Sequence, residues 1–210
     1  MNKQKNVVEF YVLCNELKNV VRTGWKMWRV QKDRLESIAE HIFGTQMLAI
    51  AMWSEFEYDI DIKKVLTMLA VHETEEIVIG DLTLFHTSAE EKAKIGHRAV
   101  SEIFSKIAGA KEIENIIYEF DERKTPEAKF AYYCDKLECD LQCRIYDEQG
   151  LVDINNQEGN IAIKNEQVQK LRSENKSWSE MWIEFDQGKI NFDEHFLSVS
   201  NYIKNNKITK

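Results

Sequence analysis

The stretch "LAVHETEEIVIGDLT" (residues 69–83) sets an apolar helical run directly before a concentration of acidic side chains. With 3.6 residues per turn, the apolar face at Met68 and Leu69 continues into His72 and Glu73. A carboxylate on a buried face is costly unless it is protonated, paired with a charge or bound to a cation. The stretch therefore predicts a buried helix that ends in a charged site inside the protein.

The rest of the chain shows the same helical spacing. One proline and eight glycines leave few helix breakers in 210 residues, and the apolar residues between them recur every three or four positions. We therefore expect an all-α protein, a helical bundle with extra carboxy-terminal helices. The expected helices cover residues 5–21, 36–55, 61–78, 88–107, 111–121, 126–148, 164–174, 177–187 and 192–205.

Residues at several of the expected helix starts fit the known capping preferences. Asp61, Ser88 and either Asn191 or Asp193 can accept hydrogen bonds from the backbone N–H groups of a first turn. Pro126 stands where a first helical turn tolerates a residue without an N–H group. These residues predict where the corresponding helices begin.

The length of the chain is enough for one domain with a single substantial core. The segment "DEQGLVDINNQEGN" (residues 147–160) contains two glycines and several Asn and Asp residues, which is typical of a long loop. We therefore expect a main bundle in residues 1–150 and a carboxy-terminal helical extension in residues 151–210, packed on the same domain. The functional residues are expected in the first part.

The charge balance limits the possible partners. The 36 acidic residues outnumber the 28 basic ones, and a net charge of -8 opposes binding of duplex nucleic acid. A small anionic ligand remains compatible with local positive charge. No stretch approaches the roughly 20 continuous apolar residues of a membrane-spanning helix, and "MNKQKNVVEF" at the amino terminus lacks the apolar core of a secretion signal. We therefore expect a cytoplasmic protein without a membrane partner.

The cysteines do not form a recognisable framework. Three of the four, Cys134, Cys139 and Cys143, fall in one expected helix, and Cys14 lies far from them in the chain. Reduced, buried thiols are the simpler interpretation. Cys139 and Cys143 share a helix face and could hold a soft metal, but no second Cys or His pair with zinc spacing accompanies them.

His41 is a further inward-facing donor. It lies among the apolar positions Ile38 and Ile42 of the expected helix 36–55. Taken alone, a histidine on such a face is more often satisfied within the core than bound to a ligand. Gly44 costs a helix about 1 kcal/mol relative to alanine, which favours close packing or binding near His41.

Another donor lies on the expected helix 126–148. Asp135 is about 100° from the apolar position Cys134, so it lies at the edge of the buried face. From there its carboxylate could reach a shared pocket, or it could be an ordinary surface residue. Asp140, on the other flank, is a rival that spacing alone does not exclude.

Together these helices offer two imidazoles and two carboxylates, from His41, His72, Glu73 and Asp135. Such a donor set suits a first-row divalent ion such as Mn, Co, Fe or Zn, and Mg less comfortably. A cation would balance the acid that the chain places inside. The alternative is a buried hydrogen-bonded network in a helical interaction protein.

The order of these residues resembles the HD-domain phosphohydrolases, which are named for their His … His-Asp … Asp metal ligands. More specifically, four blocks resemble the branch that contains bacterial 5′-deoxynucleotidases and related eukaryotic HD-containing nucleotidases. The blocks are "RTGW" (22–25), "ESIAEH" (36–41), "HETEEIVIGDLT" (72–83) and "AYYCDKLECDL" (131–141). Four blocks in the same order make the likeness more specific than any one of them.

The resemblance implies an all-α bundle, usually a homodimer, that uses one divalent ion to remove phosphate from deoxynucleoside 5′-monophosphates. Position by position, it implies His41, His72, Glu73 and Asp135 as the metal ligands. Asp135 directly precedes "KLE", as the family's aspartate does, so the resemblance favours Asp135 over Asp140. Glu73 departs from the pattern, because the family normally has aspartate there.

The resemblance also implies roles around the metal. Glu76 and Asp81 match two acidic catalytic positions, while Arg22 and Trp25 match basic and aromatic residues that meet the phosphate and the sugar. Trp25 could also be a core anchor. Two other functions remain open: hydrolysis of nucleoside triphosphates or other phosphate esters, and a non-catalytic nucleotide- or metal-binding module, because Glu73 replaces the usual aspartate.

Overall fold

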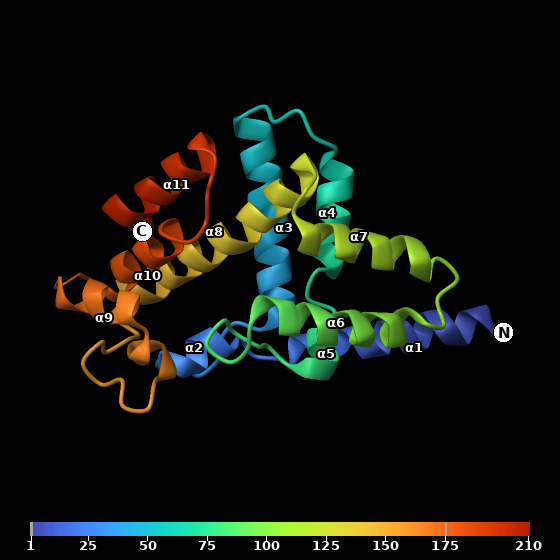
Figure 1. Cartoon of the computed structure of the whole chain (residues 1–210), viewed down its shortest axis with the longest axis horizontal. Helices are drawn as coiled ribbons and strands as arrows, with labels where there is room; N and C mark the ends of the chain where they lie inside the picture. Colours follow the sequence, from blue (N-terminus) through green and yellow to red (C-terminus); the bar gives the residue numbers. More distant parts are fainter. Residues whose placement is uncertain (1, 175) are drawn as a thin grey trace. The chain divides into compact units, whose positions relative to one another are not determined.

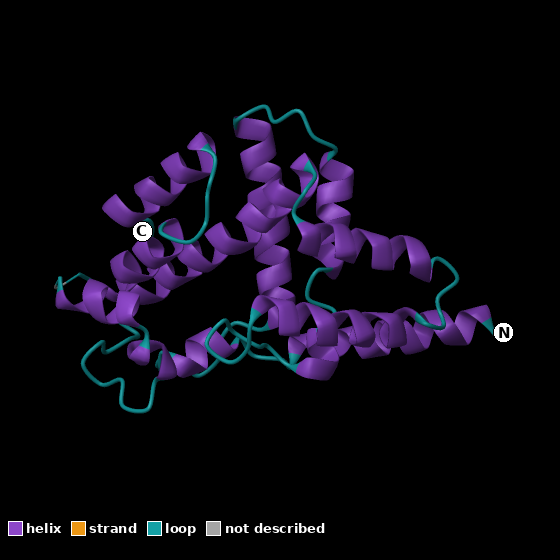
Figure 2. Ribbon diagram, viewed as in Figure 1, coloured by secondary structure: helices purple, strands orange, loops and turns teal. Residues whose placement is uncertain are grey.

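The structure, a computed structural model, describes residues 2–174 and 176–210. Its regular secondary structure is helical, and the described residues contain no β-strand (Figure 2). The predicted all-α class is confirmed. Figure 1 shows the elements in chain order. They are α1 (Lys3–Asn15), η1 (Glu16–Lys18), α2 (Thr23–Met27), α3 (Ile38–Glu55), α4 (Ile62–Val71), α5 (Glu76–Ile79), α6 (Ala89–Phe104), α7 (Ala110–Glu122), α8 (Pro126–Glu148), η2 (Ile161–Lys164), α9 (Glu166–Ser173), α10 (Trp178–Gln187) and α11 (Glu194–Asn205).

The chain divides into two compact units. The first contains the residues up to 23 and residues 36–132, and the second contains residues 24–35 and 133–210. In the first unit α3 packs against α4, α4 against α7, and α6 against α5 and α7. In the second unit α10 packs against α9 and α11. The domain boundary expected at residue 150 remains a prediction.

Each unit has its own apolar core. In the first unit Val100, Phe104 and Ile117 are buried together, and Phe10 and Leu13 of α1 pack against them. The second unit is centred on aromatic side chains of its helices, among them Trp178 and Phe196, which are at most 2% exposed. Most helices thus bury an apolar stripe against a neighbour, as the helical spacing predicts, while α1 leaves Val7, Val8, Tyr11 and Val12 exposed.

The expected helix starts agree with the structure. The Asp61 carboxylate accepts backbone N–H groups of the first turn of α4, and Ser88 forms a capping box with Glu91 at the start of α6. Of the two residues considered for the last helix, Asp193 is the cap. Pro126 is the first residue of α8. The loop expected over residues 147–160 is also confirmed, since no helix is present between α8 and η2.

The helix expected over residues 61–78 is wrong at its carboxy-terminal end. Helix α4 ends at Val71, a turn follows, and α5 begins at Glu76. In the turn the Thr74 N–H donates to Val71 O and the Glu76 N–H donates to Glu73 O, both at 3.1 Å, so each bond spans three residues instead of four. The tighter winding changes the angle between successive side chains from about 100° to about 120°. It thereby alters which acidic side chains share a face.

The helix expected over residues 5–21 is also too long. Helix α1 ends at Asn15, and Val20 and Val21 lie outside any helix, Val21 in an isolated β-bridge. The cause is a pairing with a distant segment, because the Ile38 N–H donates to Val20 O at 2.8 Å and an isolated antiparallel bridge forms beside it. The short helix α2, which follows this pairing, was not among the predicted elements.

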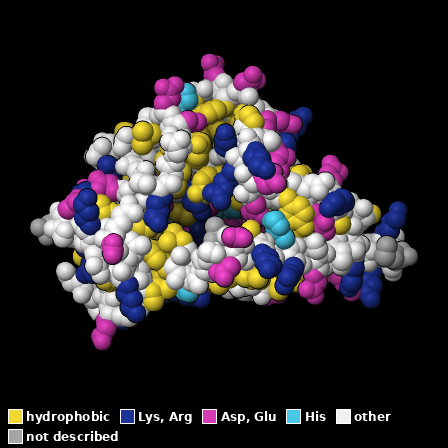
Figure 3. Space-filling model, viewed as in Figure 1, with side chains coloured by type: hydrophobic (Ala, Val, Ile, Leu, Met, Phe, Trp, Pro, Cys, Tyr) yellow, Lys and Arg dark blue, Asp and Glu magenta, His cyan; other side chains and the backbone are white. Residues whose placement is uncertain are grey.

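The molecular surface carries charges of both signs. Figure 3 shows Lys and Arg side chains interspersed with Asp and Glu side chains over the visible face. This mixture agrees with a chain in which acidic residues exceed basic ones only moderately. Among the described helices, none combines the length and the apolar character that crossing a membrane requires.

Candidate functional site

Two buried histidines form one side of the site. His41 lies in the first turns of α3, where a capping box between Ser37 and Glu40 fixes the start of the helix, and its side chain is 0% exposed. His72 caps the carboxy-terminal end of α4, and its Nδ1 lies 2.9 Å from Leu69 O. This hydrogen bond places the proton on Nδ1, so Nε2 presents a lone pair, the arrangement found in metal-ligating histidines.

The Glu73 carboxylate lies next to His72 and is held by cations. Its Oε1 lies 3.3 Å from Arg22 Nη1 and 3.7 Å from His72 Nε2, and its Oε2 lies 3.8 Å from Lys92 Nζ. Glu73 is 7% exposed. A carboxylate this deeply buried requires a balancing positive charge, and Arg22 and Lys92 supply part of it.

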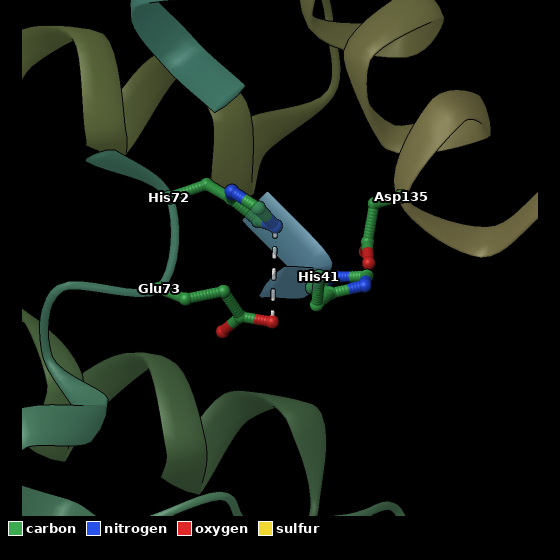
Figure 4. Close-up of side chains that lie close together, drawn as sticks. All are labelled: His41, His72, Glu73 and Asp135. Atoms are coloured by element: carbon green, nitrogen blue, oxygen red, sulfur yellow. Dashed lines mark ion pairs between the residues drawn. The ribbon is translucent and has the colours of Figure 1, made fainter. Parts of the chain in front are cut away.

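The four residues predicted as metal ligands come together. His41, His72, Glu73 and Asp135 each offer one ligand atom, and these atoms lie within 4.8 Å of one another (Figure 4). All four residues are buried. Two imidazoles and two carboxylates fit a first-row divalent ion better than Ca or a soft metal. The rival Asp140 is fully buried and does not belong to this group.

Two further carboxyl groups lie beside the cluster. Glu76, the first residue of α5, is 1% exposed, and its Oε1 accepts a hydrogen bond from Lys92 Nζ at 2.8 Å. Burial and the Glu73 charge raise the pKa of Glu76 well above its usual range, against the opposing effect of Lys92. The same two causes raise the pKa of Glu75 to about 8. Protons can therefore reside on carboxyl groups here near neutral pH.

Lys92 on α6 is a site residue that the sequence reasoning missed. Burial alone would lower its pKa, but the charges of Glu73 and Glu76 outweigh burial and raise it, so the ammonium group stays charged. A signal was present in the sequence. Lys92, Gly96 and Val100 follow one another at four-residue spacing, and the last two are buried, so Lys92 lies on the inward face of its helix.

Asp81 holds the backbone segment that carries Arg22. Asp81 Oδ2 accepts a hydrogen bond from the Thr23 N–H at 2.5 Å, and the Arg22 N–H donates to Glu36 O at 3.1 Å. Gly80 precedes Asp81 with φ of 72°, a left-handed conformation that suits glycine. Asp81 therefore fixes the segment that carries Arg22, and the Arg22 side chain reaches Glu73.

Trp25 lies in the core of the second unit. It is 1% exposed, its ring stacks on Trp182 at 5.2 Å between centroids, and it meets Tyr146 and Trp178 edge-on. These contacts favour the core-anchor interpretation. A contact between Trp25 and substrate stays a prediction.

Comparison with known proteins identifies the family. The family model described as "HD domain" matches residues 14–175. The 5′-deoxynucleotidase HDDC2 of Dictyostelium discoideum is 32% identical over 152 residues, which cover 69% of this chain and 79% of that protein. The 5′-deoxynucleotidase hdd1 of Schizosaccharomyces pombe is 29% identical over 154 residues, 70% of this chain and 75% of that protein.

A solved structure supports the same assignment. The PH0347 protein of Pyrococcus horikoshii OT3 aligns with a TM-score of 0.65 at 25% identity, over 94% of this chain and 98% of that chain. The order of the buried donors, the match of the family model and this shared fold agree. The chain therefore belongs to the HD domain family.

Proposed function

We propose that the protein is a divalent-metal-dependent 5′-deoxynucleotidase, which removes phosphate from deoxynucleoside 5′-monophosphates. The observation that carries the proposal is the buried cluster of His41, His72, Glu73 and Asp135, with Arg22 in contact with one of its carboxylates. The substrate class rests on the relatives, whose names describe them as 5′-deoxynucleotidases. A homodimer in the cytoplasm, as expected from the sequence, is part of the proposal.

The cluster supplies the ligands for one ion, which could be Mn, Co, Fe, Zn or Mg. Once bound, such an ion lowers the pKa of a water molecule toward neutrality and polarises a phosphoryl oxygen. The hydrogen bond from His72 to Leu69 O orients the imidazole for this role. Glu73 contributes a longer side chain than the usual aspartate, and its carboxylate is anchored by Arg22 and Lys92.

Glu76 is the proposed proton-handling residue. Its carboxyl is buried, and burial together with the Glu73 charge raises its pKa, so it holds a proton more readily than an ordinary carboxyl and can pass it to the leaving oxygen. Lys92 holds one of its oxygens at 2.8 Å, so the group keeps a single orientation. Glu76 therefore combines a fixed geometry with a raised pKa.

Arg22 is the proposed phosphate-binding residue. Its guanidinium presents a planar set of donors that matches phosphate oxygens, and it already pairs with a carboxylate of the cluster. Asp81 acts on the same segment by accepting the Thr23 N–H. Arg22 thus enters the site from a backbone that is held in place.

Preference for a deoxy sugar would follow from an apolar wall near the 2′ carbon. A ribose 2′ hydroxyl that loses its water without gaining a hydrogen-bond partner weakens the binding free energy by about 1–3 kcal/mol. This corresponds to roughly ten- to two-hundredfold preference for the deoxy substrate. The resemblance predicts that Trp25 meets the sugar, while its stacking on Trp182 favours the alternative interpretation of Trp25 as a core anchor.

A phosphate-release screen tests the proposal. The substrates are dAMP, dGMP, dUMP and dTMP, compared with AMP, GMP, UMP and one nucleoside triphosphate, each with Mn²⁺, Co²⁺ or Mg²⁺. We expect metal-dependent release that is faster for the deoxy monophosphates. Equal rates for ribo and deoxy substrates would contradict the deoxynucleotidase assignment, and release from the triphosphate alone would favour the alternative hydrolase.

A further inference from the structure

Two cationic side chains contact the Glu73 carboxylate, one at each of its oxygens. Arg22 Nη1 lies 3.3 Å from Oε1, and Lys92 Nζ lies 3.8 Å from Oε2. Arg22 reaches Glu73 from the segment before α2, and Lys92 reaches it from α6, so the two positive charges stand on different sides of one carboxylate. Two convergent cations form an anion-binding arrangement of the kind that phosphate also uses.

The exposure of these side chains shows which of them solvent can reach. The side chain of Lys92 is 27% exposed, that of Arg22 13%, and that of Glu73 9%. The other partner of Lys92, Glu76, has a side chain that is 0% exposed. Of these four side chains, that of Lys92 is therefore the most exposed to solvent.

Two carboxyl groups contact the ammonium group of Lys92. Glu73 Oε2 lies 3.8 Å and Glu76 Oε1 lies 2.8 Å from its Nζ. A divalent cation held by Glu73 would take over the negative charge that now attracts Arg22 and Lys92. Both cations would then face the same centre with positive charge available to a second anion.

From this geometry we propose that Lys92 is a second phosphate-binding residue, which together with Arg22 holds the phosphate of the substrate once Glu73 is engaged with the metal ion. The inference rests on the proposed function for the identity of the substrate. In this arrangement Lys92 exchanges its contact with Glu73 for a phosphate oxygen and keeps its hydrogen bond to Glu76. Metal binding and phosphate binding are therefore coupled through one carboxylate.

The test measures binding of inorganic phosphate to the Mn²⁺-loaded full-length protein by isothermal titration calorimetry. Lys92→Met keeps most of the side-chain volume and removes the charge. We expect its phosphate affinity to fall roughly ten- to hundredfold, the range of a lost charge-assisted hydrogen bond. The matched control is Lys94→Met, which removes an exposed charge from the same helix and should leave phosphate affinity unchanged.

The manganese affinity of the same variants separates phosphate binding from a structural role. Lys92→Met should bind Mn²⁺ as tightly as the native protein or more tightly, because a cation that competes for Glu73 is gone. Lys92→Arg should recover phosphate affinity. Native-like phosphate affinity in Lys92→Met would overturn the proposal, and so would a loss of manganese binding together with phosphate binding, since Lys92 would then shape the metal centre itself.

A measurement on the native protein covers the case in which these variants do not fold. An N-hydroxysuccinimide ester acylates the neutral amine of lysine, so mass spectrometry after labelling at alkaline pH compares how readily the reagent reaches and acylates each lysine. Inorganic phosphate should protect Lys92 when Mn²⁺ is present and not in its absence, while Lys94 should react equally in all conditions. Identical modification of Lys92 with and without phosphate would contradict the proposal.

The outcomes also distinguish this inference from the proposed function. Phosphate binding that depends on Mn²⁺ and Lys92, in a protein that releases no phosphate from nucleotides, would leave the inference standing and remove the nucleotidase assignment. Deoxynucleotide hydrolysis with an unchanged KM in Lys92→Met would keep the assignment and remove Lys92 from substrate binding.

Discussion

Replacement of Glu76 by glutamine tests the role of this residue in proton transfer. Glutamine has the same shape, and its side-chain oxygen can still accept the hydrogen bond from Lys92 that Glu76 Oε1 accepts at 2.8 Å. The amide group takes the place of Oε2, for which no hydrogen-bond donor is present among the described residues. The variant therefore keeps the shape and the hydrogen bond from Lys92, and it loses the negative charge and the ability to exchange a proton.

The expected effect on rate is large and the expected effect on stability is small. Loss of a general acid or base lowers turnover about 10²–10⁴-fold, equivalent to about 3–5 kcal/mol in the activation free energy. Burial of the ionised carboxyl is unfavourable, as its raised pKa shows, so removal of the charge should not destabilise the fold. We expect the melting temperature to fall by no more than about 2–4 °C, or roughly 1 kcal/mol.

The assay compares kcat, KM, metal content and melting temperature of Glu76→Gln with those of the native protein. Glu75→Gln is the matched control, because it makes the same chemical change at the neighbouring acid, which packs against Gly96 of α6. The control should retain most of its turnover. Unimpaired turnover in Glu76→Gln would remove Glu76 from the mechanism, and a loss of bound metal in that variant would assign Glu76 to the metal centre.

Three other substitutions give distinct expectations. His72→Ala should abolish metal binding but keep a helical circular dichroism spectrum, and full metal occupancy by elemental analysis would refute its assignment as a ligand. Glu73→Asp should bind metal at least as tightly by calorimetry, because it restores the side chain usual in the family; loss of the ion would show a site built around the longer acid. Burial favours protonation of Glu148, yet hydrogen bonds from Thr209 and other donors outweigh it and lower its pKa to about 2. Glu148 therefore stabilises the fold above its ordinary pKa near 4.5, and this contribution is lost as the pH falls toward 2. The check is urea unfolding of the native protein and of Glu148→Gln over a range of pH. A difference in their free energies of unfolding that stays the same down to the lowest pH would contradict this expectation.

Helical periodicity was sufficient to find most of the candidate metal centre. His41 and His72 each continue an apolar stripe at intervals of three and four residues, and both are buried as that spacing requires. Periodicity does not distinguish Asp135 from Asp140 as the donor from α8, because each flanks the apolar face of that helix. Only the comparison with a family pattern favoured Asp135, the residue that lies with the other donors.

The features that sequence reasoning missed depend on contacts between distant segments. Val20 lies outside any helix because its carbonyl pairs with the Ile38 N–H, and no local propensity encodes that pairing. The end of α4 at Val71 follows from a change in hydrogen-bond spacing within residues that are all compatible with a helix. The sequence does not single out Lys92, because a lysine on a helix is ordinarily solvated. Its place in the site follows only from its contacts with Glu73 and Glu76.

Anomalous diffraction from crystals grown with Mn²⁺ tests the central claim most directly, because it locates the ion without reference to activity. We expect one strong peak about 2.0–2.3 Å from donor atoms of His41, His72, Glu73 and Asp135, the range of metal–nitrogen and metal–oxygen bonds. A crystal in which the ion binds elsewhere, or in which these four side chains hold no ion at saturating Mn²⁺, would contradict it.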